Sequence, residues 1–405
     1  MTTLNSFLLN AVAGPRPLTA PARFAGLEEC IGRLTLLFAF QRKLLLAEGG
    51  WLPRVPYWDA KLMIGEHILC DAQHAEMILK RLHELKASSA EHQQPAGLDE
   101  LMRDLTCARN GDEWLRGLYG RIKPWFVDKL RRYLASSDPV MDTPTREAMD
   151  RIIAEQQRQI AWFGQFQPEF SPWEQPDTST WCDYLGKVLA GVVVDDGMRR
   201  NAKLRVTRPA GCVDMEGDAP LRRDATFRMV NPAEGLPEES TFDEKRVMVF
   251  FHHVQEMQFA ESLGAILYGT REMPWAFHFD LARHLADEVR HSRMGQERLA
   301  QLGVNLSRVP MFDVHYQFRS QLHPVERFAL MTLVIEAGAF ASKRANVELF
   351  EKNGDEVSVL YESYDIRDEL LHTNLGHLWV PIMLRVYHDS RTMTELIEHC
   401  RGLQA

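Results

Sequence analysis

Two Glu-x-x-His motifs constrain the fold of this chain more than any other feature of its sequence. The first is formed by Glu288 and His291, and the second by Glu369 and His372. On an α-helix, residues three apart lie on one face, so each motif sets a carboxylate beside an imidazole. One such motif is common on a solvated helix face. Two of them, each preceded by an aspartate, indicate a shared site.

Single glutamates precede the two motifs at nearly equal separations. Glu256 lies 32 residues before Glu288, and Glu336 lies 33 residues before Glu369. In an antiparallel helical hairpin, this separation leaves about four turns of helix on each side of a short loop. The six side chains can therefore meet at one level of a four-helix bundle. Four Glu and two His in this arrangement form the ligand set of a carboxylate-bridged pair of metal ions.

This pattern resembles the ferritin-like diiron-carboxylate proteins over about residues 242–381. The first motif, preceded by Asp287, has the Asp-Glu-x-Arg-His form of their oxygenase and desaturase branch, whereas the second, preceded by Asp368, lacks the Arg. The resemblance implies that both aspartates orient ligand imidazoles. It also implies that six residues bind the metals and form the catalytic centre: Glu256, Glu288, His291, Glu336, Glu369 and His372.

His284 lies one turn before Glu288 on the same predicted face. Some N-oxygenating members of the superfamily carry an extra His ligand, although on the fourth helix, where this chain has Asp365. His67 repeats the position of His284 in the first half of the chain. We therefore expect His284 to support the ligands or to pack in the core, with direct metal binding as the alternative.

Glu336 is the most informative single residue, because its helix face is apolar on both sides. A buried carboxylate without a partner costs several kcal/mol, and a metal ion or a buried arginine would remove that cost. The small residues 337–339 next to it can allow close helix packing or leave a pocket for substrate. On the first helix, Glu256 is preferred to Glu261, which lies nearly two turns too close to the hairpin.

The first half of the chain resembles a degenerate copy of the second. Residues 64–77 match residues 281–294 in the positions of His, an acid, His and Met. Cations replace the counterparts of Glu336 and His372, and cations cannot hold a metal ion. We expect an ion-paired remnant there, made of Asp71, His74, Glu155, Lys123 and Arg158. The predicted fold class is therefore all-α, with tandem ferritin-like four-helix bundles.

Proline, glycine and capping residues divide the chain into regions. We predict an N-terminal tail (1–22), a degenerate helical bundle (23–167), a Pro/Gly-rich linker or lid (168–240), and a metal-binding bundle with a C-terminal helix (241–405). Within the linker, only 181–201 reads as helical. Thr241 and Glu244 form a capping-box pattern that opens the last region, and Pro381 is expected to end its fourth helix.

Composition excludes several classes of function. A net charge of −9 offers no basic surface for nucleic acid, and the longest apolar runs are too short to span a membrane. The six cysteines form no C-x-x-C pair, so free thiols in the cytoplasm are the simplest interpretation.

By resemblance, we expect an O2-dependent monooxygenase or oxidase that acts on a small organic substrate. Two iron ions are the expected cofactor, with O2 as co-substrate, and manganese or a mixed manganese–iron pair would fit the same donors. A ferredoxin or a reductase would supply electrons, and a homodimer is compatible with the sequence. The alternative is a metal-binding or iron-storage-related protein without an organic substrate. A scaffold with a vestigial site is disfavoured because all six ligands are intact.

Overall fold

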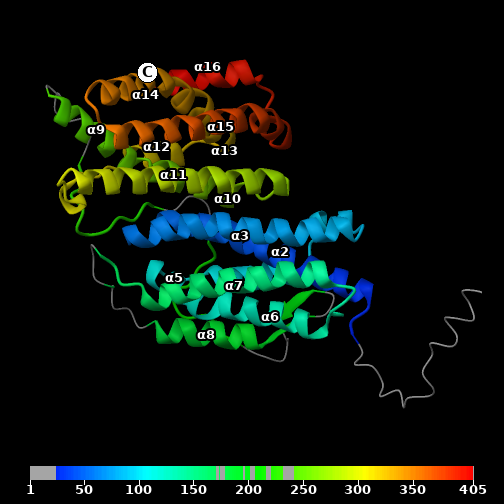
Figure 1. Cartoon of the computed structure of the whole chain (residues 1–405). Coiled ribbons are helices and arrows are strands. Elements are labelled where there is room, and N and C mark those ends of the chain that lie inside the picture. The colour runs from blue at the N-terminus through cyan, green and yellow to red at the C-terminus, as the bar shows by residue number, and fades with distance from the viewer. Residues whose placement is uncertain are drawn as a thin grey trace, which may run out of the picture.

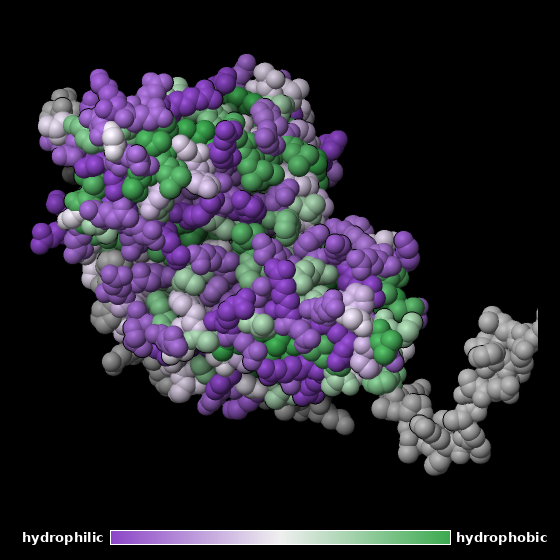
Figure 2. All heavy atoms as spheres, in the orientation of Figure 1, coloured by the Kyte–Doolittle hydropathy of each residue, from purple (hydrophilic) through white to green (hydrophobic). Residues whose placement is uncertain are grey.

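The computed structural model describes residues 24–169, 173, 178–194, 197–200, 206–215, 220–230 and 241–404. The fold class is all-α, as predicted, and the one sheet among the described residues is a short antiparallel hairpin of β1 (Val192–Val194) and β2 (Met198–Arg200). The predicted tail, 1–22, lies outside these residues. No helix in the described part of the chain has both the length and the apolar composition needed to cross a bilayer. Hydrophilic and hydrophobic residues are interspersed on the face shown in Figure 2.

The N-terminal helices pack into one bundle around an aromatic and aliphatic core. They are α2 (Leu27–Trp51), η1 (Leu52–Arg54), α3 (Trp58–Glu84), η2 (Ser88–His92), α4 (Leu98–Thr106), α5 (Gly111–Gly117), the π-helix η3 (Leu118–Ile122), α6 (Lys123–Ser136), α7 (Thr143–Gln165) and α8 (Ser179–Ala190). Helix α2 packs on α3, α3 on α7, and α6 on α7. Trp114 and Phe126 are fully buried in this core.

The C-terminal helices form the second bundle. They are α9 (Phe242–Gln255), α10 (Met257–Gly269), α11 (Trp275–Gln301), η5 (Leu306–Arg308), α12 (Val314–Ser320), α13 (Pro324–Ala329), the π-helix η6 (Leu330–Glu336), α14 (Ala337–Lys352), α15 (Glu356–Val386) and α16 (Met393–Gln404). Helix α9 opens with the predicted capping box of Thr241 and Glu244. Helix α11 packs on α9, α10 and α15, and α15 packs on α14. Four long helical stretches, formed by α9 with α10, by α11, by η6 with α14 and by α15, make up this bundle, and each carries at least one of the predicted ligands or adjoins it.

Two predicted helix boundaries are wrong. The segment 181–201 is helical only as far as Ala190, because β1 and β2 follow as a hairpin. Helix α15 does not end at Pro381 but continues to Val386. Proline removes one helical hydrogen bond, and burial of Val380 and Met383 beside it outweighs that loss.

The two bundles lie against each other, with α3 on α11 and α2 on α10 (Figure 1). Their backbones approach closely where a Cβ added to Gly264 would lie 2.5 Å from the carbonyl oxygen of Gly49. The interface also holds a buried ion pair, in which Lys61 Nζ lies 2.6 Å from Glu261 Oε1. The first bundle therefore supports α11, the helix that carries the first Glu-x-x-His motif.

Candidate metal centre

Both single glutamates lie where a helix departs from regular α-geometry. Glu256 is the residue between α9 and α10, and Glu336 is the last residue of the π-helix η6. Short π-helical segments within α-helices recur at functional sites. The coincidence of both departures with predicted ligands supports a functional reason for them.

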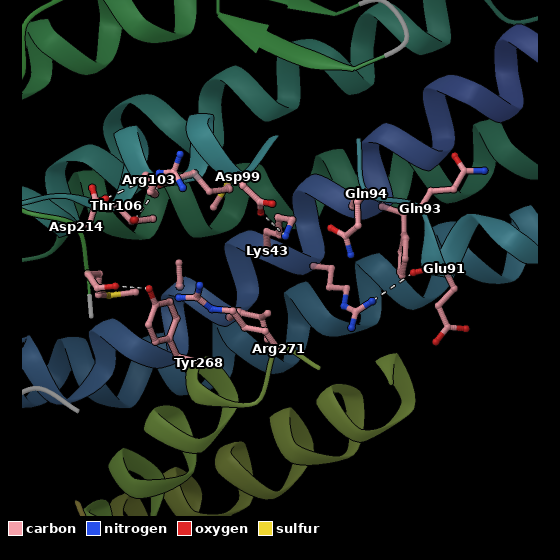
Figure 3. A pocket seen from close by; sticks show the side chains of 17 residues that line it. Lys43, Glu91, Gln93, Gln94, Asp99, Arg103, Thr106, Asp214, Tyr268 and Arg271 are labelled. Carbon is pink, nitrogen blue, oxygen red and sulfur yellow. Dashed lines mark hydrogen bonds and ion pairs between the residues drawn. The ribbon is translucent and has the colours of Figure 1, made fainter. Parts of the chain in front are cut away.

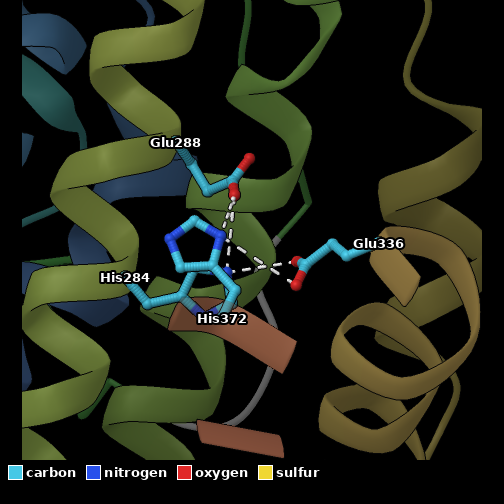
Figure 4. A group of neighbouring side chains, drawn as sticks. All are labelled: His284, Glu288, Glu336 and His372. Carbon is cyan, nitrogen blue, oxygen red and sulfur yellow. Dashed lines mark hydrogen bonds and ion pairs between the residues drawn. The ribbon is translucent and has the colours of Figure 1, made fainter. Parts of the chain in front are cut away.

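Four side chains from three helical stretches converge in the first donor group, which we call group A (Figure 4). It consists of His284 and Glu288 from α11, Glu336 from η6 and His372 from α15, and their donor atoms lie within 4.8 Å of one another. His284 Nε2 lies 3.1 Å from Glu336 Oε1, and His372 Nδ1 lies 3.2 Å from Glu288 Oε1. The rings of His284 and His372 are stacked, with centroids 3.7 Å apart. All four residues are buried.

A second set of donors, group B, lies next to group A. It consists of Glu256, His291 from α11, and Asp365 and Glu369 from α15, again within 4.8 Å of one another. His291 Nδ1 lies 3.3 Å from both Glu256 Oε2 and Asp365 Oδ1. Glu369 Oε2 is also 3.6 Å from His372 Nδ1 of group A, so the two groups are contiguous.

The two groups are built to one pattern. Each takes a Glu and the residue one turn before it from one motif helix, a His from the other motif helix, and one of the single glutamates. His284 precedes Glu288 as Asp365 precedes Glu369, four residues in each case. The structure therefore places His284 among the donor atoms, a position compatible with direct metal binding as well as with the expected supporting role.

Lys343 from α14 lies inside group B. Its ammonium nitrogen is 2.5 Å from Asp365 Oδ2, 2.9 Å from Glu369 Oε1 and 3.6 Å from Glu256 Oε1. Burial alone would lower the pKa of this lysine, but the three carboxylates outweigh burial and raise its pKa well above the usual value. Group B thus already attracts and holds a cation.

The aspartates that precede the motifs support the imidazoles crosswise. Asp368 of α15 lies 3.1 Å from His291 Nε2 of α11, and Asp287 of α11 lies 3.5 Å from His372 Nε2 of α15. Arg290 Nη2 is 2.6 Å from a carboxylate oxygen of each aspartate. The arginine of the Asp-Glu-x-Arg-His motif therefore joins the two acids that orient the imidazoles.

The donors of both groups are poorly satisfied by the protein itself. In group A, His284 Nδ1, Glu288 Oε1, Glu336 Oε2 and His372 Nδ1 are buried and make no hydrogen bond of good geometry, although His372 Nδ1 and Glu288 Oε1 lie 3.2 Å apart. The same is true of His291 Nδ1, Asp365 Oδ1 and Glu369 Oε2 in group B. Most buried polar atoms in proteins have a partner, so such a concentration requires an explanation. Metal ions at the two groups would fit these donor atoms.

Carboxylates that surround the imidazoles favour their protonated form. Burial alone would lower the pKa values of His291 and His372, but the neighbouring acids raise both well above the usual value. Burial also raises the pKa of Glu336, although His284 opposes this shift. The metal-free centre therefore carries protons that a metal ion would have to displace.

All six predicted ligands are brought together, and Glu261 is not among them. Glu261 instead accepts hydrogen bonds from Lys61 and from Arg223, whose Nη2 lies 2.7 Å from Glu261 Oε2. Sequence reasoning did not assign Asp365 or His253 to the donors, although His253 lies one turn before Glu256, and it missed Glu362. His253 and Glu362 form a contact with each other and, with Asp365, a third donor group beside group B.

The first bundle holds the ion-paired remnant that the sequence predicts. Lys123 Nζ contacts Asp71 and lies 2.9 Å from Glu48 Oε1, all three being buried. His74 Nε2 lies 2.7 Å from Glu155 Oε2. Cys70, Asp71 and His74 are close enough to hold an ion, but both carboxylate oxygens of Asp71 and both ring nitrogens of His74 already have hydrogen-bond partners. Glu48 was not predicted. The segment that corresponds to Glu256 is 39–43, which contains no acid, and Glu48 lies beyond it.

A cavity of about 210 Å³ reaches the ligand carboxylates of both groups. Phe259, Phe312, Ile335 and Ala339 contribute to its walls. Of the small residues 337–339, Ala339 lines this cavity, whereas Gly338 is exposed and does not.

A larger cavity, of about 520 Å³, lies elsewhere, between the two bundles (Figure 3). It is lined by cations that already have partners. Lys43 Nζ lies 2.6 Å from Asp99 Oδ1, and Arg42 donates to the carbonyl oxygens of Glu91 and Met273. No residue of groups A and B lines it, so we do not associate it with the candidate centre.

Residues 195–400, just over half of the chain, match the family DUF455, which is described as a protein of unknown function. The chain belongs to the DUF455 family. The matched region contains every donor of groups A and B, together with Lys343 and the crosswise aspartates. No curated protein and no solved structure is similar enough to count as a match. The function of this DUF455 protein therefore has to be argued from its donor groups.

Proposed function

We propose that this DUF455 protein binds two metal ions at groups A and B and uses them to oxidise a small organic molecule with O2. The observation that carries the proposal is the concentration of buried, unpartnered carboxylate and imidazole atoms in two contiguous groups. Carboxylate and imidazole donors suit iron and manganese. The resemblance to diiron-carboxylate oxygenases supports iron.

Two ferrous ions would supply two electrons to O2. Hydroxylation of a substrate RH consumes O2, two electrons and two protons, and it yields ROH and water. A cycle therefore needs an electron donor such as a ferredoxin or a reductase. The protein's own contribution is a mostly apolar cavity beside the ligand carboxylates, which limits access of water to the reacting groups.

Lys343 has a defined place in this proposal. In the metal-free centre its ammonium compensates the carboxylates of group B, and entry of a metal ion at group B displaces it. Group A holds no ammonium, and its two imidazoles become neutral donors once they release their protons, so we expect it to bind its metal ion first.

The proposal is tested by loading the protein with Fe²⁺ under anaerobic conditions and then adding O2. We expect Fe²⁺ binding to saturate at about two ions per chain, and oxidation to consume about one O2 per two ions. Continued uptake of iron with formation of a ferric mineral would instead support a storage protein. No reaction with O2 would contradict the proposal.

A matched pair of variants tests whether the cavity admits substrate. Ala339→Leu fills the cavity, whereas Gly338→Leu adds the same side chain one residue away, on the exposed side of the helix. We expect both variants to retain their metal, and only Ala339→Leu to lose substrate-dependent oxidation. Equal behaviour of the two variants would show that this cavity is not the substrate site.

A further inference from the structure

Arg319, in α12, carries a buried charge that the described residues leave without an acceptor. The residue is 3% exposed, and its Nη1 atom is buried and has no hydrogen-bond partner. Its guanidinium carbon lies 3.9 Å from the centroid of the Phe259 ring. An aromatic face stabilises a cation, but it leaves the N–H donors unsatisfied.

The other two arginines that are buried among the described residues show what a structural arginine looks like here. Arg298 Nη2 lies 2.6 Å from Asp355 Oδ1. Arg327 Nη2 donates to the carbonyl oxygens of Ser320 and Leu322, both at 3.1 Å. A buried charge that lacks such a partner is costly. Arg319 therefore differs from both.

The surroundings of Arg319 connect it to the metal centre. It lines a cavity of about 430 Å³, which shares His315 and Ile335 with the cavity that reaches the ligand carboxylates. Its stacking partner, Phe259, lines the cavity next to the metal ligands. Glu288 and Glu336 are near enough to influence its charge, but bound metal ions would take up these carboxylates. The guanidinium would then have no counter-charge from group A.

We propose that Arg319 binds the carboxylate of the substrate, which is an organic acid with an apolar body. This inference rests on the proposed function, whose substrate class it names. The planar guanidinium matches a carboxylate in a bidentate geometry. The cavity next to the ligands favours an apolar body, because Phe312, Ile335 and Ala339 contribute to its walls. The acid group would thus anchor one end while the other end faces the metal centre.

Calorimetric titration of the Mn²⁺-loaded full chain, without O2, tests this directly. The probes are hexanoate, the uncharged hexanamide of the same length, and inorganic phosphate. We expect hexanoate to bind at least about 10-fold more tightly than either probe. Hexanamide has no charge to strengthen its hydrogen bonds to the guanidinium, and phosphate has no apolar body to pack against the cavity walls. Equal binding of hexanoate and hexanamide, or preferential binding of phosphate, would overturn the proposal.

Variants separate Arg319 from the metal ions, which can also bind carboxylates. We expect Arg319→Met to weaken hexanoate binding about 10- to 100-fold and Arg319→Lys to weaken it less. Arg308→Met, at an exposed arginine nearby in sequence, should leave binding unchanged. Wild-type affinity in Arg319→Met would place the carboxylate on the metal ions and refute the assignment. If that variant does not fold, Arg319→Lys and the amide comparison still decide.

The outcomes also separate this inference from the proposed function. Hexanoate binding that depends on Arg319, in a protein that does not consume O2, would support the carboxylate site and refute the oxygenase. Consumption of O2 that is indifferent to carboxylates and to Arg319 would do the reverse.

Discussion

Replacement of Lys343 by Met should make the metal-free protein less stable and the metal-bound protein easier to form. The lysine ammonium lies within 3.6 Å of three carboxylates, two of them within 3 Å. Removal of one partner from a buried ion pair costs about 3–5 kcal/mol. For a cooperative unit the size of the second bundle, each kcal/mol corresponds to roughly 2–4 °C in Tm. The melting temperature of the metal-free variant should therefore fall by about 10 °C.

The same lysine competes with the metal ion at group B. Without the ammonium, the second metal ion no longer has to displace a cation, so it should bind on the order of 100-fold more tightly. Thermal unfolding of the metal-free protein and anaerobic calorimetry with Mn²⁺ measure the two effects. Lys352→Met, at an exposed lysine of the same helix, is the control. An unchanged Tm together with unchanged affinity for the second ion would refute the role assigned to Lys343.

Three further predictions concern the surroundings of the donors. Asp368→Asn should weaken metal retention at group B about 10- to 100-fold, and Asp287→Asn should weaken it at group A by a similar factor. In each variant one imidazole loses the carboxylate that orients it. Equal loss at both sites in each variant would contradict the crosswise pairing. Lys123→Met should lower the Tm by several degrees with unchanged metal content, since it leaves buried carboxylates uncompensated; a loss of metal measured by elemental analysis would contradict this. Metal binding should release protons and tighten as pH rises, because the raised pKa values of His291 and His372 keep both side chains protonated without metal. Calorimetry in buffers of different ionisation enthalpy would detect the released protons. Metal binding without proton release would refute the prediction.

The spacing of the two motifs and the two single glutamates was sufficient to predict that these four glutamates meet. Equal separations placed Glu256 and Glu336 level with the two motifs, and the structure brings all four glutamates into contiguous groups. The same argument excluded Glu261, which is engaged by Lys61 at the interface between the bundles. Helical periodicity is a strong local rule, so distances along and between helices can be estimated from the sequence.

One missed donor had a signal in the sequence. Asp365 precedes Glu369 by four residues, just as His284 precedes Glu288, and this repetition would have identified both as donors. Lys343 lies two helical turns after Glu336 on the following stretch, but a lysine at such a position is normally solvated. Only the packing of α14 on α15 shows that its ammonium is buried among carboxylates.

Other features depend on tertiary packing and could not be read from local patterns. The helix α15 passes through Pro381 because its flanking residues are buried. The lack of an acceptor for Arg319 Nη1 among the described residues is a property of the folded interior, since a sequence shows a charge but not what surrounds it. The π-helix at Leu330–Glu336 likewise has no established sequence signature in this chain.

The number of metal ions per chain tests the central claim most directly. Elemental analysis of the wild-type protein, Glu336→Ala and Asp71→Ala, each loaded with Fe²⁺ or Mn²⁺ and then desalted, compares the two bundles under one condition. We predict about two ions per chain in the wild type and in Asp71→Ala, and loss of at least the group A ion in Glu336→Ala, because group A loses one of its four donors. Full metal content in Glu336→Ala together with loss of metal in Asp71→Ala would contradict the account.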